Sequence, residues 1–191
     1  EDEVREMITY YKDENALPED VTVDRLVELM KPWYDNYCFS SRKLEERMFN
    51  SDMTLYFLNS YLQQQLPPET MVDNNIRTDY SKLRHLIRID KTFGVNTSVI
   101  QQIVTEGSIT AQISTSFPAE KFKSLLFYFG MLSIQGTDFG SAILGIPNLT
   151  VREQLYTYLV EAYREAKMFD LDLSSFSGLV KGMALRGEWE A

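Results

Sequence analysis

The sequence predicts an α+β protein that is mainly helical, and three observations support this fold class. Across most of the chain, apolar residues recur every three or four positions, which is the spacing of an amphipathic helix. At residues 109–113 the spacing falls to two, and two short apolar runs flank a glycine-rich turn at 136–140, as in strands joined by turns. Hydrophobic residues make up 44% and charged residues 25% of the 191 positions, the balance of a folded globular chain.

The first part of the chain is expected to form a helical bundle. Residues 3–12 carry apolar side chains at helical spacing and predict a short first helix. Asp24 is the expected cap of a second helix. Pro32 lies near the end of this helix and is expected to bend or stop it, because proline lacks a backbone donor.

The stretch KPWYDNYCF, residues 31–39, crowds four aromatic residues around an Asp-Asn pair. Asn36 is expected to adopt the left-handed backbone conformation that ends many helices, since asparagine tolerates it better than most residues. The chain would then reverse and fold the aromatic residues back against the helix. Two interpretations remain open: a packed corner of the core, and an aromatic patch that contacts a ligand.

Two more helices are predicted before residue 93. Asp52 is the expected cap of a helix from residue 53 to about residue 64, and two prolines then break the pattern. Its inward-facing side chains are expected to be Leu55, Leu58, Tyr61 and Leu62. Asp79 is the expected cap of the next helix, which runs to about residue 89.

From residue 96 the pattern predicts helix, strand, helix and hairpin in that order. A helix begins at Asn96 or Thr97 and ends at Gly107, and alternating apolar residues at 109, 111 and 113 then predict a strand. Pro118 is expected to open a second helix that Gly130 closes. Two apolar runs on either side of the turn at 136–140 predict the hairpin. This order is typical of a winged-helix-like module in which the strand pairs with the hairpin.

The last part of the chain is predicted to be helical. Asn148 or Thr150 is the expected cap of one helix, and Glu153 follows Thr150 at the spacing of a capping box. Asp172 or Ser174 is the expected cap of a final helix. The predicted division is therefore a helical subdomain over 1–93, the winged-helix-like module over 94–148 and C-terminal helices over 149–191.

Charge and cysteine content restrict the environment and the partners. The chain has 28 acidic and 19 basic residues, a formal net charge of −9, which opposes general binding to nucleic acid phosphates. Cys38 is the only cysteine, so no internal disulfide can form and a reducing cytoplasm is expected. No apolar run approaches 18 residues, and no membrane partner is expected. The chain begins with Glu1 rather than Met, so we expect it to be part of a longer protein.

No complete catalytic or metal-binding motif is present in the sequence. Neither the phosphate-binding pattern GxxxxGK[ST] nor GxGxxG occurs. Zinc sites need several Cys or His residues at short spacing, and this chain has only Cys38 and His85. We therefore expect no catalytic residue, no metal ligand and no cofactor within this chain.

One basic stretch stands out from the acidic background. RTDYSKLRHLIRIDK, residues 77–91, has five basic residues and two acidic ones, and Arg84 and Arg88 are four positions apart on one expected helix face. This stretch either contacts a phosphate or an acidic partner, or it is a solvated surface balanced by acidic neighbours.

Several motifs, in order along the chain, resemble a family of bacterial AAA-ATPase-like proteins. WYDNYCF resembles the family pattern WYDGYxF, with Asn36 in the place of the usual Gly, and MFNSDMTLYFL resembles VYNPxSVLxFL, with Ser51 in the place of Pro. SLLFYFGMLSIQG followed by LGIPNLTVRE resembles SLLFxxGYLTI and IPNxEVR. The stretches EDEVREMITYY, NIRTDYSKLRHLIRIDK and MALRGEWEA add weaker likenesses. The resemblance covers nearly the whole chain.

The resemblance implies a role for this chain as the middle region of such a protein. Proteins of this family carry an N-terminal P-loop ATPase domain and a C-terminal nuclease-like domain of the PD-(D/E)xK type. The helical part would then be a lid over the nucleotide, and Arg77, Arg84 or Arg88 would contact a phosphate or form an interdomain salt bridge. The residues that match the structural motifs are Trp33, Tyr34, Asp35, Asn36, Tyr37, Phe39, Asn50, Ile146, Pro147 and Asn148.

Cofactors and partners follow from the same resemblance. ATP and Mg²⁺ would bind to the intact protein rather than to this chain, whose partners would be the protein's own P-loop and nuclease-like domains. No catalytic residue of either domain can be transferred to this chain. The alternative is a stand-alone module that binds a protein or a nucleic acid without ATP.

Overall fold

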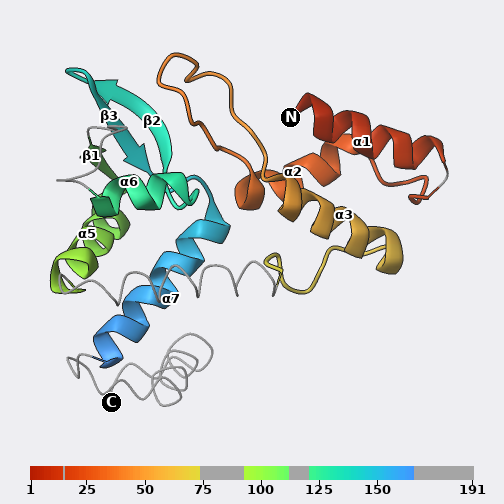
Figure 1. Ribbon diagram of the computed structural model, residues 1–191. Helices are drawn as coiled ribbons and strands as arrows, with labels where there is room; N and C mark the ends of the chain where they lie inside the picture. Colours follow the sequence, from red (N-terminus) through yellow and green to blue (C-terminus); the bar gives the residue numbers. More distant parts are fainter. Residues whose placement is uncertain (15, 74–92, 112–120, 166–191) are drawn as a thin grey trace, which may run out of the picture. The chain divides into compact units, whose positions relative to one another are not determined.

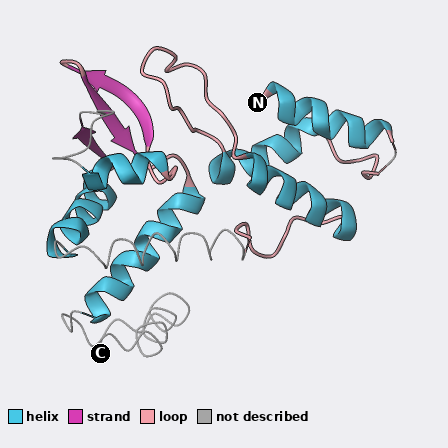
Figure 2. Cartoon of the chain, viewed as in Figure 1, coloured by secondary structure: helices cyan, strands magenta, loops and turns pink. Residues whose placement is uncertain are grey.

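A computed structural model describes residues 1–14, 16–73, 93–111 and 121–165 (Figure 1). The described residues form six α-helices and one small three-stranded antiparallel sheet. Figure 2 shows the helices in cyan and the strands of the sheet in magenta, and helices make up most of the described elements. The predicted mixture of helices with a small antiparallel sheet is confirmed.

Three helices make up the first part of the described chain, and two of the predicted caps are wrong. Helix α1 spans Asp2–Asp13, α2 spans Val23–Tyr34 and α3 spans Ser51–Gln64. Thr22, not Asp24, caps α2 by accepting a hydrogen bond from the Arg25 backbone N–H at 3.2 Å.

Asn50 Oδ1 likewise caps α3, in place of Asp52, by accepting from the Met53 N–H at 3.0 Å. Both predicted aspartates lie instead within the first turn, where their negative charge favours the helix dipole. Pro32 does not stop α2, which continues for two more residues.

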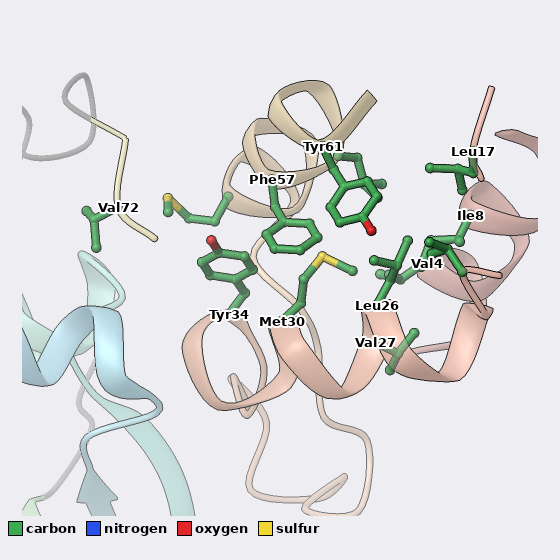
Figure 3. Close-up of a cluster of buried hydrophobic side chains, with 13 residues drawn as sticks. Val4, Ile8, Leu17, Leu26, Val27, Met30, Tyr34, Phe57, Tyr61 and Val72 are labelled. Atoms are coloured by element: carbon green, nitrogen blue, oxygen red, sulfur yellow. The ribbon is translucent and has the colours of Figure 1, made fainter. Parts of the chain in front are cut away.

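The core of these three helices contains two tyrosines and a phenylalanine as well as aliphatic side chains (Figure 3). Phe57 is fully buried between Tyr34 and Tyr61, with ring centroids 6.2 Å and 5.9 Å away. Leu58 and Tyr61 are buried as predicted, but Leu55 is 49% exposed, so its predicted inward orientation is wrong. The thirteen buried residues of this core are Val4, Ile8, Leu17, Val21, Leu26, Val27, Met30, Tyr34, Met53, Phe57, Leu58, Tyr61 and Val72.

The predicted order of helix, strand, helix and hairpin is present. Helix α5 spans Phe93–Glu106, β1 spans Ser108–Ala111, α6 spans Lys121–Tyr128, β2 spans Ser133–Asp138 and β3 spans Ser141–Gly145. The strand order is β1-β3-β2, so β3 is central and both of its neighbours run antiparallel to it. Helix α5 begins earlier than the predicted Asn96 or Thr97.

Left-handed backbone conformations follow α2, α3, α5 and α6 and also close the hairpin. Gly107 after α5 has φ +82° and Gly130 after α6 has φ +70°, values that glycine adopts without steric cost. The tight turn between β2 and β3 has positive φ at Phe139 and Gly140. These reversals place β1 and β2 on opposite edges of β3.

Helix α7 spans Leu149–Glu165 and crosses the boundary between two compact units, Glu1–Tyr156 and Thr157–Ala191. The predicted division at residues 93 and 148 stays a prediction.

No described helix has both the length and the apolar character that spanning a membrane requires. Several predictions fall outside the described residues: the helix from Asp79, the start of a helix at Pro118, the helix from Asp172 or Ser174, and Arg77, Arg84 and Arg88.

Candidate functional site

Residues 33–39, here called the corner, leave α2 with an abrupt reversal. Asn36 has φ +79°, which confirms the predicted left-handed conformation. Tyr37 then forms an antiparallel bridge with Met48, with N···O distances of 3.1 Å and 2.9 Å. The Asn50 N–H donates to the Tyr34 carbonyl at 2.8 Å, so the chain returns to the corner immediately before α3 begins.

The corner is hydrogen-bonded to residues 146–150, here called the return segment, which precede and start α7. Asn36 Nδ2 donates to the Pro147 carbonyl at 2.9 Å, across 111 positions of sequence. Asn148 Nδ2 donates to the Asp35 carbonyl at 3.0 Å, in a buried bond. Thr150 Oγ1 donates to the Trp33 carbonyl at 2.8 Å. Two side chains of the return segment therefore satisfy backbone carbonyls at the end of α2, and Asn36 of the corner satisfies a carbonyl of the return segment.

Strand β2 adds a second set of bonds to the corner. Ser133 is fully buried, and its hydroxyl donates to the Asn36 carbonyl at 2.9 Å while accepting from the Cys38 N–H at 2.8 Å. The Ile134 N–H donates to the Cys38 carbonyl at 2.9 Å, and Arg47 Nη1 donates to the Ile134 carbonyl at 2.8 Å. We call the corner, the return segment and the start of β2, joined by these bonds, the polar junction.

Asn148 has two functions in the polar junction. Its Nδ2 bonds to the corner, and its Oδ1 accepts from the Val151 N–H at 3.2 Å and so caps α7. Of the two predicted caps for this helix, Asn148 is therefore the one observed, while Thr150 uses its hydroxyl on Trp33. The start of α7 is consequently fixed to the end of α2.

The aromatic side chains of the corner mostly pack inward. Tyr34 is fully buried, and its hydroxyl donates to the Met71 carbonyl at 2.8 Å. Burial raises the pKa of the Tyr34 phenol well above its usual value, so it remains a neutral donor. Tyr37 is buried and stacks on Phe39, which is 48% exposed. The geometry agrees with a packed corner, and only Phe39 presents a large aromatic surface to solvent.

A charged pocket of about 740 Å³ adjoins the polar junction. Lys31 lines it, and its Nζ donates to Glu1 Oε2 at 2.8 Å. That hydrogen bond and the charge of Glu1 raise the pKa of Lys31, and the charge of Asp35 adds to the effect. Asp35 also lines the pocket and is 7% exposed.

The structure brings together the motif residues of the corner, Asn50 and the return segment, which lie far apart in sequence. Ser133 was missed by the sequence analysis, although a small polar residue within the apolar run MLSIQ was a usable signal. The described residues contain no group of three or more His, Cys, Asp or Glu side chains placed so that they could hold a metal ion.

Comparisons with protein-family models, with curated proteins and with solved structures found no match to this chain.

We expect Asn36→Ala to lower the free energy of unfolding by about 2 kcal/mol, because alanine loses the bond to Pro147 and tolerates a positive φ poorly. Asn36→Gly loses only the bond, so the expected loss is about 1 kcal/mol. Urea denaturation of the two variants separates these contributions. Equal stability of the two variants would show that the left-handed backbone at this position costs alanine nothing.

Proposed function

We propose that this chain is a non-catalytic coupling region of an AAA-ATPase-like protein. In this proposal it packs as a lid on the ATP-binding domain and connects that domain to a C-terminal nuclease-like domain. The observation that carries the proposal is the polar junction. Its side-chain bonds across 111, 113 and 117 positions join the end of α2 to the start of α7.

Such bonds suit a part that transmits motion as a rigid body. Buried polar bonds depend on direction, so displacement of α2 without α7 would leave the Asp35 carbonyl and the Asn148 amide without partners. A lid that responds to nucleotide would therefore move the start of α7 with it. The order of α5, β1, α6, β2 and β3 supports the further proposal of a winged-helix-like module.

The proposal makes a direct prediction about the encoded protein. The gene is expected to encode GxxxxGK[ST] after an apolar strand upstream of the segment that corresponds to Glu1. ATP and Mg²⁺ would bind there, with the phosphates held by the backbone N–H groups of that loop. An open reading frame that includes this chain but lacks such a loop would contradict the proposal.

In the intact protein, Arg84→Ala and Arg88→Ala are each expected to lower the rate of ATP hydrolysis at least about tenfold, if that arginine stabilises phosphate charge. Arg25→Ala, at an exposed position in the first turn of α2, is the matched control and should leave the rate unchanged. A steady-state phosphate-release assay measures all three. Unchanged rates in both test variants would remove the arginines from the proposal.

The competing function, a stand-alone binding module, predicts a different result. The isolated chain would then bind a nucleic acid with an affinity that falls as salt rises. With a net charge of −9, we expect no such binding at physiological ionic strength.

A further inference from the structure

The charged pocket beside the polar junction has an excess of carboxylates. Four acidic residues and two basic ones line it, and the lining charged residues are Glu1, Glu28, Lys31, Asp35, Glu45 and Arg47. Both basic side chains have other partners, since Lys31 bonds to Glu1 and Arg47 bonds to the Ile134 carbonyl. The excess of two negative charges favours a cationic ligand over a phosphate or a carboxylate.

Asp35 provides an independent indication of a ligand. Its side chain is almost fully buried, at 7% exposed, and its Oδ1 is buried without a hydrogen-bond partner. A buried carboxylate oxygen without a donor is costly, and native structures rarely leave one unsatisfied. Lys31, in the last turn of α2 and four positions before Asp35, could have paired with it, but its Nζ bonds to Glu1 at 2.8 Å. A donor from outside the described residues would complete the site.

We propose that this pocket binds the guanidinium group of an arginine side chain on a partner protein. A guanidinium has five N–H donors in a plane and is more weakly hydrated than an ammonium, so it suits a partly buried carboxylate. Glu28 and Glu45, both exposed at the pocket, add attraction at longer range. No described cluster of ligands fits a metal ion, and the pocket is large enough to admit a side chain. The inference does not depend on the proposed ATPase relationship.

The test uses small probes and the chain as it exists. N-acetyl-arginine amide is titrated into the ¹⁵N-labelled chain and followed by chemical shifts, with the lysine and citrulline analogues in parallel. Citrulline has nearly the shape of arginine without its charge. We expect saturable shifts at the backbone amides of Asp35 and Asn36 with arginine, weaker binding with lysine and none with citrulline. Equal binding of citrulline, stronger binding of lysine or no binding of arginine would overturn the proposal.

Variants assign the binding to this pocket. Asp35→Asn is expected to weaken arginine binding about tenfold, because one charge-assisted hydrogen bond is lost. Glu28→Gln and Glu45→Gln are expected to weaken it about twofold each, and their exposed positions keep the fold intact. Glu69→Gln, exposed and outside the pocket, is the control and should bind as the original chain does. Unchanged binding in both Glu28→Gln and Glu45→Gln would overturn the proposal even if Asp35→Asn folds poorly.

Discussion

Replacement of Phe57 by alanine is expected to lower the free energy of unfolding by about 4 kcal/mol. Phe57 is fully buried in the core of α1, α2 and α3, and its ring contacts Tyr34 edge-on and stacks on Tyr61. The substitution removes apolar surface from the core and leaves a cavity whose aromatic walls cannot collapse fully. Urea denaturation monitored by circular dichroism measures the change.

Leu55→Ala is the matched control for this prediction. Leu55 lies on the same helix two positions earlier but is 49% exposed, so the expected change is within about 0.5 kcal/mol. The comparison also tests the corrected orientation of α3. A loss at Leu55 as large as that at Phe57 would mean that the helix presents a different face to its core.

Asn148→Ala is expected to lower the free energy of unfolding by about 3 kcal/mol. The substitution removes the cap of α7, a loss of about 1 kcal/mol. It also leaves the buried Asp35 carbonyl without its donor, which costs about 2 kcal/mol more. Thermal unfolding of the variant should show one transition at lower temperature.

Two further variants separate the functions of Asn148. Asn148→Asp keeps an oxygen that can cap α7 but loses the donor to Asp35, so it is expected to remain well below the original stability. Asn59→Ala, at the exposed face of α3, should change stability by less than about 0.5 kcal/mol. If Asn148→Ala were no more harmful than Asn59→Ala, the polar junction would not hold the two segments together.

Helix caps show where sequence reasoning failed. In each wrong case two polar residues lie two positions apart, Thr22 with Asp24 and Asn50 with Asp52. Both members are good cap residues, and composition does not distinguish a cap from a first-turn acid that favours the helix dipole. The outcome depends on where the preceding chain turns, and at Asn50 that turn is fixed by the hydrogen bond to Tyr34.

The orientation of α3 could not be predicted for a related reason. Periodicity alone allows more than one buried face, because the apolar and aromatic residues of α3 occupy most of the helix circumference; they are Met53, Leu55, Tyr56, Phe57, Leu58, Tyr61 and Leu62. Packing against Tyr34 selects the face that contains Phe57. Leu55 is left near solvent as a consequence.

Local pattern was enough to predict the described helices, the strands and the left-handed Asn36, apart from helix caps and ends, because each element forms from residues that are near in sequence. Only the tertiary structure decided that Asn36, Ser133, Asn148 and Thr150 meet at one polar junction. Their hydrogen bonds join groups about a hundred positions apart, and no local periodicity specifies such a pairing. It exists because the carbonyls at the end of α2 and just after it need donors once the chain is folded, and Ser133, Asn148 and Thr150 supply them.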